Sequence, residues 1–234
     1  MKTINYEIKD GDEGIRTTVG HMARLIRRDA QNPKIIAKAK ELKGKDDLST
    51  IKNIFTYVHK NYKYKHDPSD REVVAAPIRL YECVESENCQ LPEWAGQDCD
   101  DLTVLCCALY EAAGYKTLIK IIDWKTSGEG FTHVYPMVYV PSMKKYIPTD
   151  PVAKTKGWMW EKLPVNRYET YTIDGKLYKK GSKSGLSNDL AFTSTHSQVR
   201  GEKSLLQTLN EHSGLIAATA AVVSAIWLIY YKDK

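Results

Sequence analysis

The sequence contains no Cys-x-x-Cys pair, although it has five cysteines. Their spacing is irregular, so a zinc ribbon and a thioredoxin-like redox motif are both unsupported. The disulfide framework of a small secreted domain is normally denser than this, and a reducing compartment is therefore favoured. Cys106 and Cys107 lie in an apolar run and are expected to be buried thiols. The sequence leaves open whether Cys83 and Cys89 pair or remain reduced.

The N-terminus also lacks a long apolar stretch. It begins MKTINYEIKD, so no secretory signal peptide is predicted. No charge of one sign dominates either, because the formal net charge is +5, which favours anionic surfaces without implying nucleic acid. The basic residues of the segment 16–43 are expected to form a solvated face. Without an aromatic-interleaved basic patch or a known binding motif, nucleic acid ranks last among the partners.

One long apolar run is present, at the C-terminus. Residues 215–231 are LIAATAAVVSAIWLIYY, with no charge, which is near the lower limit of roughly 17 to 25 residues for a membrane-spanning helix. Trp227, Tyr230 and Tyr231 suit a membrane interface. We therefore predict a membrane helix over residues 213–234. A helix buried in the protein or in an oligomer is the alternative.

Helical periodicity recurs in the N-terminal half of the chain. Apolar residues from 16 to 43 recur at helical spacing and are interrupted at the Asn32–Pro33 step. A further helix is predicted over residues 48–61, which carry one apolar stripe. The segment 67–96 contains several prolines, so it is predicted to be mostly loop with one helical turn near residues 79–83.

The strongest helix signal begins at Asp98. This aspartate fits an N-cap, Asp101 stands three residues later as in a capping box, and Gly114 provides a stop signal. The buried face of this helix is predicted to consist of Leu102, Leu105, Cys106 and Leu109. Three strands are then predicted in LIKIID, FTHVYPMVYV and YIPTDP. Pro136 indicates a bulge or an edge position in the middle strand.

Cys99 occupies the first turn of this helix. The unpaired backbone N–H groups there favour a thiolate and can donate to a developing oxyanion. The carboxylates of Asp98, Asp100 and Asp101 work in the opposite direction, because they disfavour a further negative charge. A cationic imidazole close to the sulfur is therefore needed to hold the thiolate.

His133 is the natural source of that imidazole, since it stands near the start of the second predicted strand. Asp150 ends the next strand, so a hairpin can bring the two side chains together, and the carboxylate would fix the ring tautomer and stabilise the imidazolium. With Cys99 they form a nucleophile, base and orienting acid. By spacing alone, a chain with five cysteines and six histidines offers such triples by chance.

The stretches GQDCDDLTVLCCALYEAAGYKTLIKII, FTHVYPMVYV and YIPTDP resemble the transglutaminase-like superfamily, which shares the papain-type cysteine architecture. The family's cysteine, histidine and aspartate fall on Cys99, His133 and Asp150. Gln97 lengthens the family's usual spacing between glycine and cysteine by one residue. Upstream, IKNIFTYVHKNYKYKHDPSDREVVAAP is similar to transglutaminase-like proteins of bacteriophages and prophages. The resemblance covers about residues 50–152.

The resemblance implies an α+β fold. Its core would be transglutaminase-like and papain-like, with the helix bearing Cys99 packed on an antiparallel sheet, N-terminal helices before it and an apolar helix after it. Four segments are expected: a basic helical segment over 1–47, a catalytic domain over 48–175, a polar linker over 176–212 and a hydrophobic membrane helix over 213–234.

The resemblance also suggests further site residues. A second oxyanion donor in such folds comes from a side chain before the nucleophile, and Gln97, Trp94 and Tyr64 are the candidates. Some family members bind calcium, which the carboxylates around Cys99 could hold, but helix capping explains these carboxylates more simply. We therefore expect no metal and no cofactor.

The leading hypothesis is a cysteine-dependent amide-bond enzyme that forms a thioester on Cys99. Water resolves the thioester in a peptidase and an amine resolves it in a transglutaminase, and the sequence does not choose between them. The resemblance to phage proteins favours a protein or a cell-wall peptide as substrate, with virion proteins as further partners. The alternative is a non-catalytic, membrane-associated structural protein of a virion. Both hypotheses place the protein at a membrane through its C-terminal anchor.

Overall fold

The computed structural model describes residues 11–67, 73–85, 97–124, 130–153, 158–161 and 164–182. The chain divides into two compact units, residues 1–184 and 185–234, and every described residue belongs to the first unit. The apolar helix predicted over residues 213–234 lies outside the described residues. Among the helices that are described, none is long and apolar enough to cross a membrane.

The first three helices begin where the sequence offers capping residues. They are α1 (Gly11–Asp29), α2 (Pro33–Glu41) and α3 (Asp47–Asn61). The side chain of Asn32 accepts a hydrogen bond from the Lys34 N–H, and Pro33 occupies the first turn, so a new helix starts at the predicted step. Asp46 and Ser49 form a reciprocal capping box at the start of α3. The helices predicted in these segments are confirmed.

Helix α4 (Pro77–Glu85) confirms the position of the helical turn predicted near residues 79–83, but the helix is longer than one turn. The carboxylate of Asp29, at the end of α1, accepts a hydrogen bond from the Ile78 N–H at 3.0 Å. The carboxylate of Asp101 accepts one from the Ala75 N–H at 2.6 Å. Both acceptors are far from α4 in the sequence. The local composition around α4 therefore gives no sign that hydrogen bonds stabilise the start of this helix.

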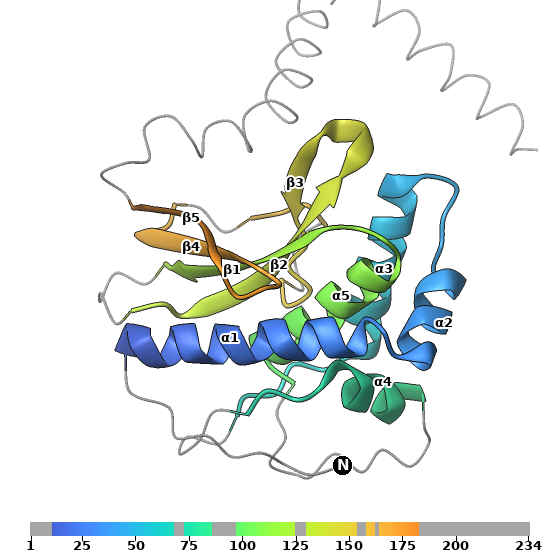
Figure 1. Cartoon of the computed structure of the whole chain (residues 1–234), viewed down its shortest axis with the longest axis horizontal. Helices are drawn as coiled ribbons and strands as arrows, with labels where there is room; N and C mark the ends of the chain where they lie inside the picture. Colours follow the sequence, from blue (N-terminus) through green and yellow to red (C-terminus); the bar gives the residue numbers. More distant parts are fainter. Residues whose placement is uncertain are drawn as a thin grey trace, which may run out of the picture. The chain divides into compact units, whose positions relative to one another are not determined.

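Five strands form one curled antiparallel sheet in the order β3-β2-β1-β4-β5 (Figure 1). The strands are β1 (Thr117–Asp123), β2 (His133–Val140), β3 (Lys145–Pro148), β4 (Arg167–Thr172) and β5 (Leu177–Ser182). The three strands predicted from the sequence are confirmed as β1, β2 and β3. Together with the helices, the sheet makes the described part of the chain an α+β fold.

Strand β5 lies within the segment 176–212, which the sequence indicates to be a polar linker. The turn before it is made possible by Gly175, whose φ is 78°. β5 is an edge strand that pairs only with β4, and its side chains are mostly exposed. An exposed edge strand needs no apolar alternation, so its composition resembles that of a linker.

Strand β2 lies between β1 and β3, so the bulge or edge position predicted from Pro136 is wrong. Pro136 pairs with Ile119 of β1, and its carbonyl accepts a hydrogen bond from the Thr149 N–H at 3.0 Å. In an antiparallel strand, the N and O atoms of one residue point to the same neighbour. The missing N–H of Pro136 therefore faces the end of β3, and no hydrogen bond of the β1–β2 ladder is lost.

Helix α5 (Cys99–Ala112) lies at the centre of the fold (Figure 1). Asp98 caps its start, as predicted, and Gly114 follows its end with a φ of 90°. Every residue from 100 to 110 is buried, so the four-residue apolar face predicted from the sequence is too narrow. The helix is buried on all sides because the other four described helices, β1 and β2 all contact it.

Helix α1 belongs to the same core as α5. Met22 and Ile26 are 1% and 0% exposed and pack in one apolar cluster with the α5 side chains. Outside this cluster, Arg16 of α1 reaches Glu169 of β4 at 2.8 Å. The described part of the N-terminal segment is therefore packed into the sheet-and-helix body.

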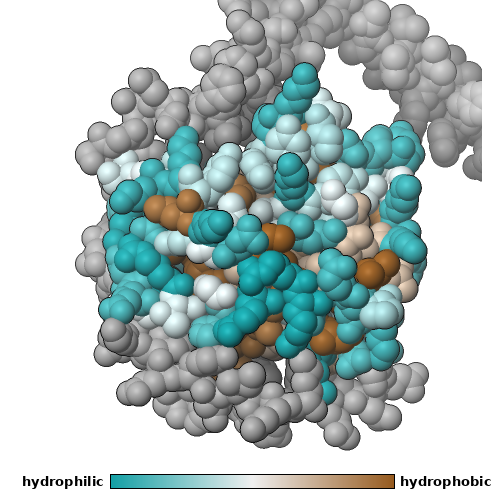
Figure 2. Space-filling model, viewed as in Figure 1, coloured by the Kyte–Doolittle hydropathy of each residue, from teal (hydrophilic) through white to brown (hydrophobic). Residues whose placement is uncertain are grey.

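The basic residues of α1 and α2 are largely engaged in ion pairs. Lys38 of α2 is 2.8 Å from Glu41 and 3.2 Å from Glu85, and Lys34 is 2.6 Å from Glu82. In the view of Figure 2, the described surface is mostly hydrophilic with small, separate apolar patches. The exposed Lys34 fits the predicted solvated face, whereas Lys38 is buried at 7% exposure against its acidic partners.

Candidate active site

Cys99 is the first residue of α5 and is half-buried, and it carries a thiol outside any disulfide. The preceding Asp98 is extended and directs its side chain to the Asp100 N–H. The Asp101 N–H donates to the Asp100 carboxylate at 2.6 Å, and the Leu102 N–H donates to the Asp98 carbonyl at 3.2 Å. Because Cys99 begins the helix, its sulfur stands where the helix supplies partial positive charge.

His133 and Asp150 lie side by side. Nε2 of His133, the first residue of β2, is 2.8 Å from the Asp150 Oδ2. The other carboxylate oxygen of Asp150 accepts a hydrogen bond from the Val152 N–H at 3.0 Å, and Asp150 is 6% exposed. A buried carboxylate held from both sides fixes the orientation of the ring. Its other nitrogen, Nδ1, is then the atom that can serve a reacting group.

Thr103 connects the start of α5 to the start of β2. Its hydroxyl donates to the Cys99 carbonyl at 2.6 Å and lies 3.3 Å from the Val134 carbonyl. Val134 follows His133 directly and faces the core, so alternation turns the His133 ring to the opposite face of the sheet. The cysteine and the histidine could therefore meet only around the start of β2, and Thr103 connects the first turn of α5 to that end of the strand.

Tyr64 is a common neighbour of the candidate nucleophile and the candidate acid. Burial, and then the negative charges of Cys99, Asp98, Asp100 and Asp150, raise the pKa of this phenol. Its ring also packs edge-on against the His66 ring, with the centroids 4.8 Å apart. The phenol therefore stays protonated and able to donate at neutral pH.

Of the other two oxyanion candidates, Gln97 lies beside the site. It pairs through its backbone with Lys65, in hydrogen bonds of 3.0 and 3.2 Å, and its side-chain oxygen accepts a bond from the Lys63 N–H at 3.3 Å. These contacts leave the amide NH₂ of Gln97 as the group able to donate. Trp94 lies outside the described residues.

Asp98, Asp100 and Asp101 bring three carboxylates within 4.8 Å of one another. Asp98 caps α5 and Asp101 holds the segment before α4. Burial raises the pKa of Asp100 and that of Asp101, and one oxygen of each has no hydrogen-bond partner. Capping by Asp98 and anchoring by Asp101 are the structural roles that the printed hydrogen bonds give this cluster.

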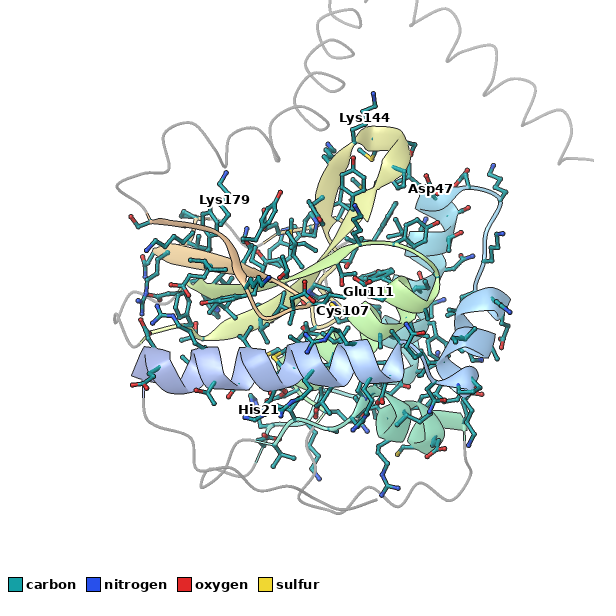
Figure 3. All side chains as sticks on the ribbon, viewed as in Figure 1. His21, Asp47, Cys107, Glu111, Lys144 and Lys179 are labelled. Carbon is teal, nitrogen blue, oxygen red and sulfur yellow. The ribbon has the colours of Figure 1, made fainter. Side chains whose placement is uncertain are left out.

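Cys106 and Cys107 are fully buried thiols, as predicted. Burial raises the pKa of each thiol well above its usual range, which makes both unreactive. Figure 3 labels Cys107 and Glu111 on α5, of which Cys107 is fully buried and Glu111 half-buried. Cys83, whose state the sequence left open, is disulfide-bonded.

Sequence reasoning missed a buried polar cluster beside His133. Lys120 of β1 lies 2.5 Å from the Glu161 carboxylate, and the Tyr135 hydroxyl donates to the same oxygen at 2.6 Å. The one available signal was the lysine at the centre of the apolar run LIKIID.

No family model matches the chain, and no curated protein matches it in sequence. One solved structure with a similar arrangement is that of a candidate protease from Parabacteroides distasonis ATCC 8503. The TM-score is 0.45 at 10% sequence identity, and the match covers 70% of this chain and 30% of that chain. The chain therefore spans less than a third of that protein's length.

Proposed function

We propose that the protein is a cysteine-dependent amide-bond enzyme of the transglutaminase-like kind, with Cys99 as nucleophile, His133 as base and Asp150 as orienting acid. The observation that carries the proposal is the 2.8 Å contact between the His133 Nε2 and the Asp150 carboxylate. The contact lies at the start of β2. Hydrogen bonds of Thr103 connect this end of the strand to the start of α5. The proposal assigns Cys99, His133 and Asp150 the roles of nucleophile, base and orienting group.

In the proposed reaction, Nδ1 of His133 takes the proton of the Cys99 thiol. The thiolate attacks the carbonyl carbon of an amide, and the partial positive charge at the start of α5 stabilises the oxyanion that forms. The imidazolium then gives its proton to the leaving nitrogen as the C–N bond breaks, which leaves a thioester on Cys99. Asp150 accepts the Nε2–H bond throughout and stabilises the transient imidazolium.

The thioester is resolved by water in a peptidase or an amidase and by an amine in a transamidase. A protein or a cell-wall peptide as substrate is part of the proposal, and so are virion proteins as partners. Both rest on the sequence resemblance to phage transglutaminase-like proteins. Attachment to a membrane through residues 213–234 is proposed from the apolar run in the sequence alone.

The test is the reactivity of Cys99 in the full-length protein. We expect iodoacetamide to alkylate Cys99 far faster than the buried thiols Cys106 and Cys107, as located by mass spectrometry. We also expect Cys99→Ala to abolish hydrolysis of a peptide library or amine incorporation into it. Cys107→Ala is the matched control and keeps both activities.

Two results would overturn the proposal. One is turnover by Cys99→Ala at the wild-type rate. The other is alkylation of Cys99 no faster than that of an unstructured peptide thiol. Slow alkylation combined with a folded protein would instead favour the non-catalytic structural role.

A further inference from the structure

Lys120 is a buried cation at the middle of the central strand. Ile119 and Ile121 on either side of it belong to the α5 core, so Lys120 projects from the opposite face of the sheet. It is 4% exposed, its Nζ lies 2.5 Å from the Glu161 Oε1, and it stands 4.7 Å from the centre of the Tyr168 ring. A buried ammonium needs such partners, because they offset the free-energy cost of removing its charge from water.

Tyr135 links this ion pair to His133. It lies directly opposite Lys120 in the β1–β2 register, and its hydroxyl donates to the Glu161 Oε1 at 2.6 Å. His133 stands two residues earlier on the same strand and therefore on the same face. The two rings are 5.6 Å apart and tilted by 33°. The contacts thus run from Lys120 through Glu161 and Tyr135 to His133.

A buried ion pair is weak support for stability, because apolar side chains of similar volume often stabilise as much or more. What this pair does is fix geometry. Two donors from neighbouring strands converge on one oxygen of Glu161, whose side chain is 8% exposed. Glu161 belongs to the short described segment 158–161, between β3 and β4. The carboxylate therefore holds this segment, and Tyr135 with it, beside the His133 ring.

We propose that Glu161 is a positioning residue for His133. Its carboxylate fixes the Tyr135 ring, which in turn keeps the imidazole beside Asp150. Its pairing with Lys120 keeps the charge on this face of the sheet balanced. The effect on catalysis rests on the proposed function. The effect on the His133 ring does not.

The other charged and titratable groups around His133 come from every neighbouring element. Asp150, after β3, bonds the ring. Cys99 is at the start of α5, and Tyr64 lies beside both. At the end of β1, Asp123 is 3.7 Å from Arg167 of β4. Removing one member of the Lys120–Glu161 pair therefore leaves one unbalanced charge on the face that carries His133.

The test is an NMR titration of the His133 ring in the full-length protein, with the resonance assigned through His133→Gln. Glu161→Gln leaves the Lys120 cation unbalanced and should move the titration midpoint to lower pH. Lys120→Met leaves the Glu161 anion and should move it to higher pH. A through-space interaction at an effective dielectric constant of about 20 predicts opposite shifts on the order of one unit. The double variant should titrate close to wild type.

Lys34→Met is the matched control, because it removes a lysine from the exposed Lys34–Glu82 pair, whose members are 62% and 41% exposed. Its His133 midpoint should stay at the wild-type value. Tyr135→Phe keeps both charges and removes only the hydrogen bond to Glu161. It should leave the midpoint in place and increase the motion of the His133 ring in NMR relaxation. It also provides a readout if a charge variant fails to fold.

The inference is overturned if the His133 midpoint does not move in opposite directions in Glu161→Gln and Lys120→Met. It is also overturned if the motion of the His133 ring in Tyr135→Phe equals that in the wild type. A cluster that only pins the segment 158–161 would lower the melting temperature without moving the midpoints. If Cys99 proves unreactive, the titration still decides the role of Glu161. If the enzyme is active, Glu161→Gln should lower kcat about tenfold or more with little change in KM, as expected for a misplaced base.

Discussion

Asp100 and Asp101 follow the candidate nucleophile directly and are 3% and 0% exposed. Burial raises the pKa of both carboxyls well above the usual range, and neighbouring carboxylates raise them further. The native state therefore holds protons on this pair more tightly than the unfolded chain does. The stability that this provides is present at acidic pH. It is lost as pH rises from about 4 through the raised values.

We expect Asp100→Asn to stabilise the protein at pH 8. An amide carries no charge to desolvate, and its NH₂ can donate to the adjacent carboxylate of Asp98, as a protonated Asp100 would. The gain should exceed about 1 kcal/mol, because each unit of raised pKa corresponds to about 1.4 kcal/mol. Urea unfolding at pH 5 and pH 8 measures it, and the gain should be smaller at pH 5.

Asp46→Asn is the matched control for this prediction. Hydrogen bonds from Ser49 lower the pKa of this exposed N-cap carboxylate, so its contribution has the opposite sign and is lost as pH falls. This variant should be no more stable than wild type at pH 8. A gain of the same size in both variants would mean that burial of Asp100 is not the cause.

At the scale of elements, the site depends on how α5 meets β2. The Thr103 hydroxyl lies one turn after Cys99 and reaches both the Cys99 carbonyl and the Val134 carbonyl. Thr103 is 0% exposed, so water cannot replace these bonds. These hydrogen bonds fix the position of the first turn of α5 along β2 and therefore relative to His133.

We expect Thr103→Val to loosen that junction. The valine keeps the branched shape and loses the hydroxyl, which should lower the free energy of unfolding by about 1 kcal/mol. Under the proposed function, kcat should fall with little change in KM, because the sulfur is no longer held at the end of β2. Steady-state kinetics together with urea unfolding measure the two effects.

Thr50→Val separates positioning from stability. Thr50 is also a buried helical threonine, and its hydroxyl donates to the Asp46 carbonyl and accepts from the Gly44 N–H, both at 2.9 Å. Thr50→Val should lose at least as much stability and keep the wild-type kcat. Equal losses of activity in both variants would contradict a special role for Thr103.

At the scale of the whole molecule, the N-terminal helix is part of the body that carries the site. Val19, Met22 and Ile26 of α1 are 2%, 1% and 0% exposed. Burying such side chains contributes about 1.5 to 3 kcal/mol each, which together rivals the total stability of about 5 to 15 kcal/mol of a typical domain. The ion pair between Asp12 and Arg167, at 2.5 Å, adds a further tie to β4.

We therefore expect a chain that starts at Asn32 to lose cooperative thermal unfolding in circular dichroism. A chain that ends at Ser184, at the boundary of the first compact unit, should unfold cooperatively within about 2 °C of the full-length protein, since it keeps every contact described here. Cooperative unfolding of the chain that starts at Asn32, at the melting temperature of the full-length protein, would contradict this expectation. It would show that α1 is not part of the folding unit, as a domain starting at residue 48 implies.

Features that depend on neighbours along the chain could be predicted from the sequence. Asn32 and Pro33 separate α1 from α2, Asp98 starts α5, Gly114 follows its end, and apolar strand patterns define β1 to β3. Capping, turn geometry and periodicity act over a few residues, so a local pattern is enough to predict them.

Features that depend on groups far apart in the sequence follow only from the packing of the folded chain. The length of α4 follows from Asp29 and Asp101, and β5 is a strand because β4 pairs with it. Lys120 is tolerated in the central strand because Glu161 meets it there. A buried charge or an edge strand is stable only when another element supplies its partner, and no local pattern contains that partner.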